Sequence, residues 1–421
     1  MELSKNYALR KYILKINHIL FALFILCIPF QDFGLQDTFL RFFGANLSNI
    51  PLILLIGLSF INFLLGERIN KKDFIISFGI IIYIIIYSLL LTISFIDDNN
   101  IIFYLYKIFS NSIIFIFWLF VYVYTKNHNK NIGKYIVVAN VIHIIGWFLS
   151  DILKINLGHM IHYMNDADYS RFHGFTLESS YFCFTAVILG ILSTYYIKNK
   201  MIKIIFYLFI VIFVVFGGSK GTLVCILISL CFYIVLSKKY NLGVKLIFLI
   251  GVILISFLGI YYILLDSFLL DLEESTSFAS RFSSILSAFY ILSDYPLGTG
   301  FGIFLPVYKV VIVKAFDLLN MYIPGIVLIY DEINNWITNE NGEGLVIRSI
   351  IFQFIAYFGI PFLISFLYYI KYMIKNILYD EKNLWLFTFI ICGLVTFAGF
   401  NYDSIIALAI IYSKIEIRKM E

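Results

Sequence analysis

Long apolar segments dominate this chain of 421 residues. A helix of roughly 20 mostly apolar residues can cross the hydrocarbon core of a bilayer. Because every backbone polar group inside a bilayer must find a partner within the protein, such segments predict an all-α polytopic membrane protein. We predict about twelve spans, of which the last is the shortest: 13–30, 48–66, 74–95, 101–124, 133–151, 175–197, 201–217, 219–236, 244–265, 346–370, 384–400 and 402–414.

The composition excludes a water-soluble protein. Hydrophobic residues make up 61% of the chain and charged residues 14%, whereas soluble domains contain about 45–50% and about 25%. So little charge cannot cover a surface that faces water, so the main solvent of the chain must be lipid. The same numbers exclude a disordered chain and a nucleic-acid-binding domain, and we expect no nucleic-acid partner.

The positive charges predict the orientation of the spans. One set of alternate connections contains 22 Lys and Arg residues and the other contains 8, while Lys107 lies inside a span and completes the 31. Cytoplasmic connections carry the excess of Lys and Arg, so both termini are predicted to be cytoplasmic. The first apolar segment follows a basic stretch as in a signal peptide. It lacks a small-residue cleavage site, and we expect a retained anchor.

One connection on the predicted outer side, residues 266–345, is much longer than the others. It contains ten carboxylates and three basic residues, Arg281, Lys309 and Lys314. Connections of this length without secondary structure are uncommon, and the stretches SSILSAFYIL and FGIFLPVYKVVIV have helix-like apolar spacing. We therefore predict a single membrane domain over residues 1–421 in which 266–345 form short helices at the membrane surface.

Unusual polar residues gather near the predicted outer face. A cation at membrane depth is costly and therefore suggests a function. Several cations near one interface predict an anionic ligand with a lipid part, such as a lipid-linked phosphate or diphosphate. The set consists of Lys107 in the outer third of the fourth span, Arg171, His173, Glu178, Lys220, Arg281, Asp294 and Arg348.

Most members of this set also have an ordinary interpretation. Lys107 can extend its ammonium toward the interface, Arg171 and Arg348 can be interfacial anchors, and Lys220 can be a cation in a turn. Glu178 can be a solvated start of a span. The histidines at 159, 162 and 173 lack metal-binding spacing, and the five cysteines form no CxxC pair, so we expect no metal and no cofactor. Three glycines at 298, 300 and 302 predict a turn that brings the backbone close to another segment.

Four segments carry a resemblance to a known family. They are RFHGFTLESSYF (171–182), GGSKGT (217–222), SRFSSILSAFYILSDYPLGTGFGIF (280–304) and IRSIIFQFIAYFGIPFLISF (347–366). Together they resemble the Wzy-type O-antigen polymerases of the O-antigen ligase/polymerase superfamily. Ser179 replaces a proline of the family pattern, and Lys220 replaces an arginine and so lacks its bidentate fork. Ligases commonly carry a histidine at the end of the large loop, about where Arg348 stands here, which favours a polymerase.

The resemblance implies a GT-C-type glycosyltransferase of the bacterial inner membrane. It would join undecaprenyl-diphosphate-linked oligosaccharide repeat units on the periplasmic face, giving the O-antigen of lipopolysaccharide or a capsular polysaccharide, with a chain-length regulator as a further partner. Two alternatives stay open, an O-antigen ligase and a flippase or transporter of lipid-linked oligosaccharide. The implied roles are Glu178 as catalytic base with Asp294 behind it, Arg281 as catalytic and diphosphate-binding residue, and Arg171, Lys220, Arg348 and Lys107 as further diphosphate ligands.

Overall fold

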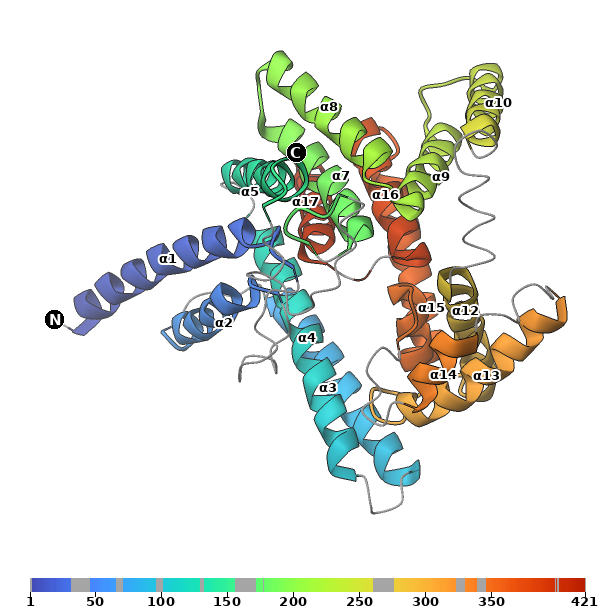
Figure 1. Cartoon of the computed structure of the whole chain (residues 1–421). Helices are drawn as coiled ribbons and strands as arrows, with labels where there is room; N and C mark the ends of the chain where they lie inside the picture. Colours follow the sequence, from blue (N-terminus) through green and yellow to red (C-terminus); the bar gives the residue numbers. More distant parts are fainter. Residues whose placement is uncertain are drawn as a thin grey trace. The chain divides into compact units, whose positions relative to one another are not determined.

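The computed structural model describes residues 2–31, 46–65, 71–95, 101–128, 132–155, 172–176, 178–259, 276–322, 330–338, 346–397, 399 and 401–420, and these residues contain no strand. The predicted all-α class is therefore confirmed for this part of the chain (Figure 1). The helices are α1 (Glu2–Leu26), α2 (Asn49–Leu64), α3 (Lys71–Phe95), α4 (Ile101–Asn127), α5 (Gly133–Trp147) followed by the π-helical turn η5 (Phe148–Ile152), α7 (Ser179–Tyr196), α8 (Lys200–Phe216), α9 (Lys220–Leu236), α10 (Leu242–Gly259), α12 (Thr276–Asp294), α13 (Phe304–Tyr322), α14 (Tyr330–Thr338), α15 (Ile350–Ile377), α16 (Glu381–Thr396) and α17 (Tyr402–Met420).

Each predicted apolar segment falls on one of these helices. Within the described residues, five helical stretches are long and apolar enough to cross a membrane: Ile75–Phe95, Ile101–Asn127, Gly133–Ile152, Ser179–Tyr196 and Ile350–Ile377. Aliphatic side chains on them are open to the surroundings, as at Leu90 (60% exposed) and Ile93 (65% exposed), which suits contact with lipid. A membrane environment is thus supported, while the count of twelve spans and their orientation stay predictions.

Several predicted boundaries differ from the observed ones. The predicted span 175–197 starts too early, because α7 begins at Ser179 and Glu178 precedes the helix. The first helix begins at Glu2 and the last extends to Met420, both beyond the apolar segments on which the predictions were based. Residues 260–275, 323–329 and 339–345, at the end of the ninth predicted span and in the large connection, lie outside the described residues.

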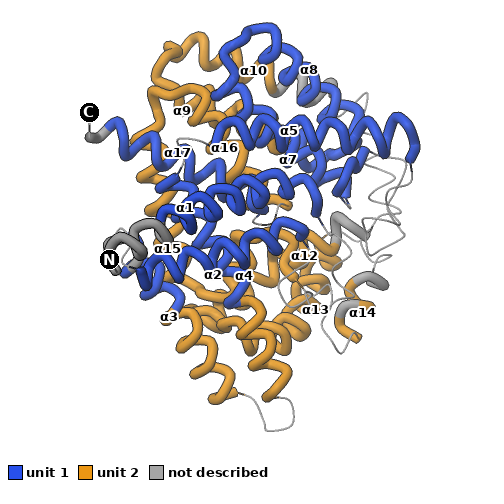
Figure 2. The backbone as a smooth tube through the Cα atoms, turned by 90° about the vertical axis from the view of Figure 1, so that its left-hand side faces the viewer, with its two compact units in different colours: residues 1–81, 112–223, 401–421 blue, residues 82–111, 224–400 orange. Residues whose placement is uncertain are grey.

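The chain divides into two compact units (Figure 2). Unit 1 contains residues 1–81, 112–223 and 401–421, and unit 2 contains residues 82–111 and 224–400. In unit 1, α5 packs against α1 and α7, and α17 packs against α7. Lys126 links three helices of this unit, because its Nζ lies 3.1 Å from an Asp73 oxygen of α3 and 3.2 Å from a Glu416 oxygen of α17. The prediction of a single membrane domain stays a prediction.

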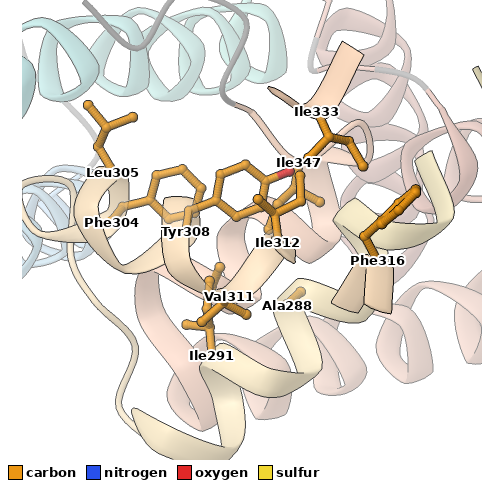
Figure 3. Packing of buried hydrophobic residues seen from close by; sticks show 11 residues of the cluster. Ala288, Ile291, Phe304, Leu305, Tyr308, Val311, Ile312, Phe316, Ile333 and Ile347 are labelled. Atoms are coloured by element: carbon orange, nitrogen blue, oxygen red, sulfur yellow. The ribbon is translucent and has the colours of Figure 1, made fainter. Parts of the chain in front are cut away.

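Unit 2 contains the helices of the large predicted connection. α12 and α13 have 19 residues each, longer than the short helices predicted, and pack on one another and on α14, while α12 also packs on α15. Figure 3 shows the shared core, in which Phe304 and Tyr308 of α13 stack with ring centroids 5.0 Å apart. The buried Tyr308 hydroxyl donates to the Val346 carbonyl at 3.4 Å, as a buried phenol requires. The location of these helices at a membrane surface stays a prediction.

The glycine-rich turn 296–302 fits into a break in α15. Gly359 has φ 55° and ψ −143°, so the helix is interrupted there, and Pro361 follows two residues later. Pro361 has no N–H and leaves the Tyr357 carbonyl without its usual helical donor. The Gly300 N–H takes that place at 2.8 Å, and the Thr299 N–H donates to Ala356 at 2.9 Å. In return, the Ile360 N–H donates to the Pro296 carbonyl at 2.8 Å.

The same turn also contacts α3 inside unit 2. The Tyr87 hydroxyl donates to the Gly298 carbonyl at 2.9 Å, and the Phe301 N–H donates to Ser88 Oγ at 3.1 Å. A Cβ atom on Gly300 would lie 3.0 Å from Ser88 Cα, and one on Gly302 would overlap the hydroxyl of α3 residue Thr92. The predicted role of these glycines, a close approach of the backbone to another segment, is therefore confirmed.

Gly359→Ala is expected to destabilise the protein strongly. An L-residue at this φ and ψ costs about 1–3 kcal/mol, and the added Cβ would overlap the Pro296 carbonyl oxygen. Thermal unfolding of the purified protein in detergent measures the loss. The matched control is Gly251→Ala in α10, where a Cβ meets nothing within 4 Å and stability should be unchanged or rise by up to about 1 kcal/mol. Equal melting temperatures for the two variants would contradict this account of the break.

Candidate functional site

Glu178 and Lys220 come from two segments of unit 1 that the structure joins. The Ser179 hydroxyl donates to the Gly217 carbonyl at 2.6 Å, and the Thr222 hydroxyl donates to the Ser180 carbonyl at 3.4 Å. These bonds hold the turn 217–222 against the start of α7. The predicted base and one predicted diphosphate ligand therefore share one neighbourhood, although about forty residues separate them in sequence.

Glu178 occupies the position directly before α7. Its backbone is extended, with φ −118° and ψ 137°, and its side chain makes no capping hydrogen bond. The carboxylate is exposed and has no ion pair with any described residue. A carboxylate that is not committed to a structural bond can accept a proton from a ligand.

Lys220 is the first residue of α9. Ser219 caps this helix, since its hydroxyl oxygen accepts the Thr222 N–H at 3.2 Å. The N-terminal end of a helix carries a partial positive charge, and the half-buried Lys220 ammonium adds a full one. Both charges favour an anion at this end of α9. The role of Lys220 as a diphosphate ligand stays a prediction.

Asp151 is a residue that the sequence interpretation missed. It is buried at the end of η5, and its carboxylate accepts the Gly174 N–H at 3.0 Å, the His173 N–H at 3.3 Å and the Ser150 hydroxyl at 2.9 Å. These bonds fix the backbone that leads to Glu178. The only available signal was a carboxylate at the end of an otherwise apolar segment.

Two buried contacts complete the support of this loop. His143 of α5 is fully buried, its Nε2 lies 3.1 Å from the Phe182 carbonyl, and its ring stacks on Phe182 at 4.4 Å. The Thr176 hydroxyl lies within hydrogen-bond distance of two carbonyls, those of His173 at 2.7 Å and Glu178 at 3.0 Å. The backbone on both sides of Glu178 is thus held in place, while Arg171, at the start of the same segment, lies outside the described residues.

Arg281 and Arg348 meet in unit 2 at one serine hydroxyl. Ser284 Oγ donates to the Arg281 carbonyl at 2.7 Å and accepts the Arg348 N–H at 3.3 Å. Both arginine side chains are half-buried. The guanidinium of Arg281 has no ion pair with a carboxylate in the described part of the chain. The backbone of Arg281 in α12 and the backbone of Arg348, just before α15, therefore lie close together.

Lys107 and Asp294 also belong to unit 2. Lys107 Nζ lies 5.2 Å from the ring centroid of Phe103, and Phe103 packs against the core shown in Figure 3. Asp294 is the exposed last residue of α12. Thirteen residues of helix separate it from Arg281, a distance of about 20 Å at 1.5 Å per residue. The structure therefore does not bring Asp294 to Arg281.

The predicted residues thus form two sets, each with its own support. Unit 1 holds Glu178 and Lys220, and unit 2 holds Arg281, Arg348 and Lys107. Across the residues that the structure describes, no group of three or more His, Cys, Asp or Glu side chains gathers as metal ligands would. Fixed cations are suited to bind and stabilise an anionic group, and an exposed carboxylate is suited to take a proton.

The described residues are those of a helical protein whose long apolar helices suit a membrane. It is similar to a protein of Klebsiella pneumoniae described as "Uncharacterized 49.5 kDa protein in cps region". The two are 28% identical over 369 residues, which cover 85% of this chain and 81% of the relative. No family model matches the chain, and no solved structure matches it. The similarity extends over most of both proteins.

Proposed function

We propose that this protein is a polysaccharide polymerase of the Wzy type, which joins undecaprenyl-diphosphate-linked repeat units into capsular polysaccharide or O-antigen. The observation that carries the proposal is the meeting of Arg281 and Arg348 at Ser284, because both were assigned to the diphosphate from sequence alone. The relative in a cps region supports a role in the biosynthesis of a surface polysaccharide. The apolar helices are suited to cross a bilayer, which is where a lipid-linked substrate lies.

The reaction requires one bond to form and one to break. The hydroxyl oxygen of the acceptor sugar attacks the anomeric carbon of the donor, and the bond from that carbon to the lipid diphosphate breaks. The electron pair leaves on the diphosphate, and the proton of the hydroxyl passes to the Glu178 carboxylate. Arg281 and Arg348 hold the diphosphate oxygens and stabilise the charge that develops on them.

Lys220 and Lys107 have supporting roles in this proposal. Lys220 adds its charge to the positive end of α9, and Lys107 adds a further cation beside the core of α12 and α13. No nucleotide sugar is needed, since the lipid diphosphate is itself the leaving group. The reaction takes place on the periplasmic face of the inner membrane, with both termini of the chain in the cytoplasm.

Purified protein with defined lipid-linked repeat units tests the proposal. The expected product is a ladder of longer glycans that remain on the lipid diphosphate, with release of undecaprenyl diphosphate. If the protein is reconstituted in vesicles, movement of the substrate from one leaflet of the membrane to the other without chain growth would instead identify a flippase. Transfer of a glycan only to a different acceptor would identify a ligase. Either of these two results contradicts a polymerase.

A further inference from the structure

Asp151 is a buried carboxylate that the proposed reaction leaves unused. Its side chain is 3% exposed and lies in the π-helical turn η5, a rare conformation that is frequent at functional sites. An unpaired charge in an apolar interior costs free energy. In the described part of the chain Asp151 pairs with no Lys or Arg, and the ring of His173, with Nε2 3.9 Å from Asp151 Oδ1, is its ion-pair partner. A charge retained under these conditions suggests a task that a neutral side chain cannot perform.

The two oxygens of Asp151 show what that task is. Oδ1 accepts the His173 N–H at 3.3 Å, and Oδ2 accepts the Gly174 N–H at 3.0 Å. Two successive backbone N–H groups that face one anion form a concave anion-binding turn, and Gly174 has the positive φ, 56°, that suits such a turn. An Asn side chain has one acceptor oxygen and one NH₂ donor, so it could accept only one of the two N–H groups. The carboxylate is therefore required by this loop.

Hydrogen bonds continue from this loop to Glu178. The His173 carbonyl accepts the Thr176 N–H at 2.8 Å, and the Thr176 hydroxyl lies 2.7 Å from that carbonyl and 3.0 Å from the Glu178 carbonyl. The Glu178 side chain itself makes no capping bond and is exposed. The position of its carboxylate therefore depends on the backbone of the loop, and Asp151 fixes that backbone through His173.

Other contacts keep the fold of this region without Asp151. Phe175 of the same loop is buried, and its ring stacks on Phe30 with centroids 4.6 Å apart. The ring of His143 stacks on Phe182 of α7 at 4.4 Å, and α7 packs on α5 and α8. Loss of the Asp151 bonds should therefore leave the helices in place and change only the course of the loop backbone.

We propose that Asp151 is a positioning residue, which holds the Glu178 carboxylate where it can take the proton of the acceptor hydroxyl. Asp151 is not a second base, because it is buried and already accepts three hydrogen bonds, the third from the Ser150 hydroxyl at 2.9 Å. This inference rests on the proposed function, in which Glu178 is the base. It adds a residue that acts on the reaction only through the loop.

A double-mutant cycle in the chain-growth assay tests this role. Asp151→Asn should lower kcat by about 10²-fold, the cost of misplacing a reacting group by about 1 Å. KM should be nearly unchanged, because the cations assigned to the diphosphate are untouched. The double variant Asp151→Asn/Glu178→Gln should be no slower than Glu178→Gln alone, since groups that act as a unit are not additive. Losses that multiply would show that Asp151 acts independently of Glu178 and would overturn the proposal.

Ser150→Ala is the matched control. It removes the third hydrogen bond to the same carboxylate and leaves both bonds to the loop. Its kcat should stay close to that of the wild-type protein. If Ser150→Ala loses as much kcat as Asp151→Asn while both keep the wild-type melting temperature, the effect does not depend on the loop bonds and the proposal is wrong.

A nitroxide spin label on Glu178→Cys gives a readout that needs no reaction. Protein without this substitution supplies the background from the five native cysteines. The mobility of the label should rise when Asp151→Asn is added and should not change with Ser150→Ala. Unchanged mobility in Asp151→Asn overturns the positioning role even if Glu178 is the base. Full activity of Glu178→Gln instead refutes the base of the proposed function, so the two failures can be told apart.

Discussion

Arg281→Ala is expected to leave cells with single repeat units in place of long chains. Arg281 is one of three basic residues in a connection with ten carboxylates. These carboxylates would repel an anionic substrate if no cation lay at its binding site. The backbone around Arg281 is fixed through Ser284 to that of Arg348. Removal of one group that stabilises developing charge typically lowers turnover by about 10²–10³-fold. Arg281→Lys should retain part of the activity, because Lys supplies the charge without the fork.

The measurement is polysaccharide chain length in cells that contain each variant at equal protein level. Lys314→Ala is the matched control, since Lys314 lies on α13 in the same connection and its side chain is exposed. It should give chains of wild-type length. Chains of wild-type length from Arg281→Ala would show that Arg281 does not bind the diphosphate. The role of diphosphate ligand would then fall to the remaining cations, Arg348, Lys220, Lys107 and Arg171.

Glu178→Gln should reduce turnover by about 10²–10⁴-fold, the usual contribution of a general base. The substitution keeps the shape of the side chain and removes the proton acceptor. Folding should be unaffected, because the Glu178 carboxylate makes no capping hydrogen bond at the start of α7. The rate of chain growth with purified protein measures the effect, and retention of the lipid-linked substrate shows that binding is intact.

Asp294→Asn provides the comparison for Glu178. Asp294 is the other carboxylate assigned to the reaction from sequence, but it lies about 20 Å along α12 from Arg281. We expect a much smaller change than for Glu178→Gln. If turnover persists in Glu178→Gln and is lost in Asp294→Asn, then Asp294 is the catalytic base and Glu178 is not.

The helices of this protein were predictable because lipid imposes a simple pattern. Twenty apolar residues in a row have few other structures open to them, and each predicted segment does lie on a helix. The predicted start of this span, residue 175, was wrong because Phe175 continues the apolar pattern, although α7 begins at Ser179. The structure keeps this segment out of the helix through Asp151, which accepts hydrogen bonds from the N–H groups of His173 and Gly174. Hydrogen bonds between residues far apart in sequence leave no periodic pattern in the sequence, so this one could not be predicted.

The candidate site was predictable as a set of residues and only partly as a geometry. Charged side chains in an apolar sequence stand out, so Glu178, Lys220 and Arg281 could be selected directly. Their supports could not, since the bond from Ser179 to Gly217 and the bonds of Ser284 join segments far apart in sequence or depend on ordinary polar residues. Ser284 has no feature that distinguishes it from the other serines of α12.

The hydrogen bonds between the glycine-rich turn and the interrupted helix α15 also limit where residues can be inserted into or deleted from this chain. Three main-chain bonds connect 296–300 to 356–360 residue by residue, so an inserted or deleted residue in either stretch displaces all three at once. The connection between α9 and α10, near Lys238 and Asn241, has no such matched partner segment among the described residues and can absorb insertions at little cost. Natural variation in length among relatives should therefore collect in that connection and avoid the turn.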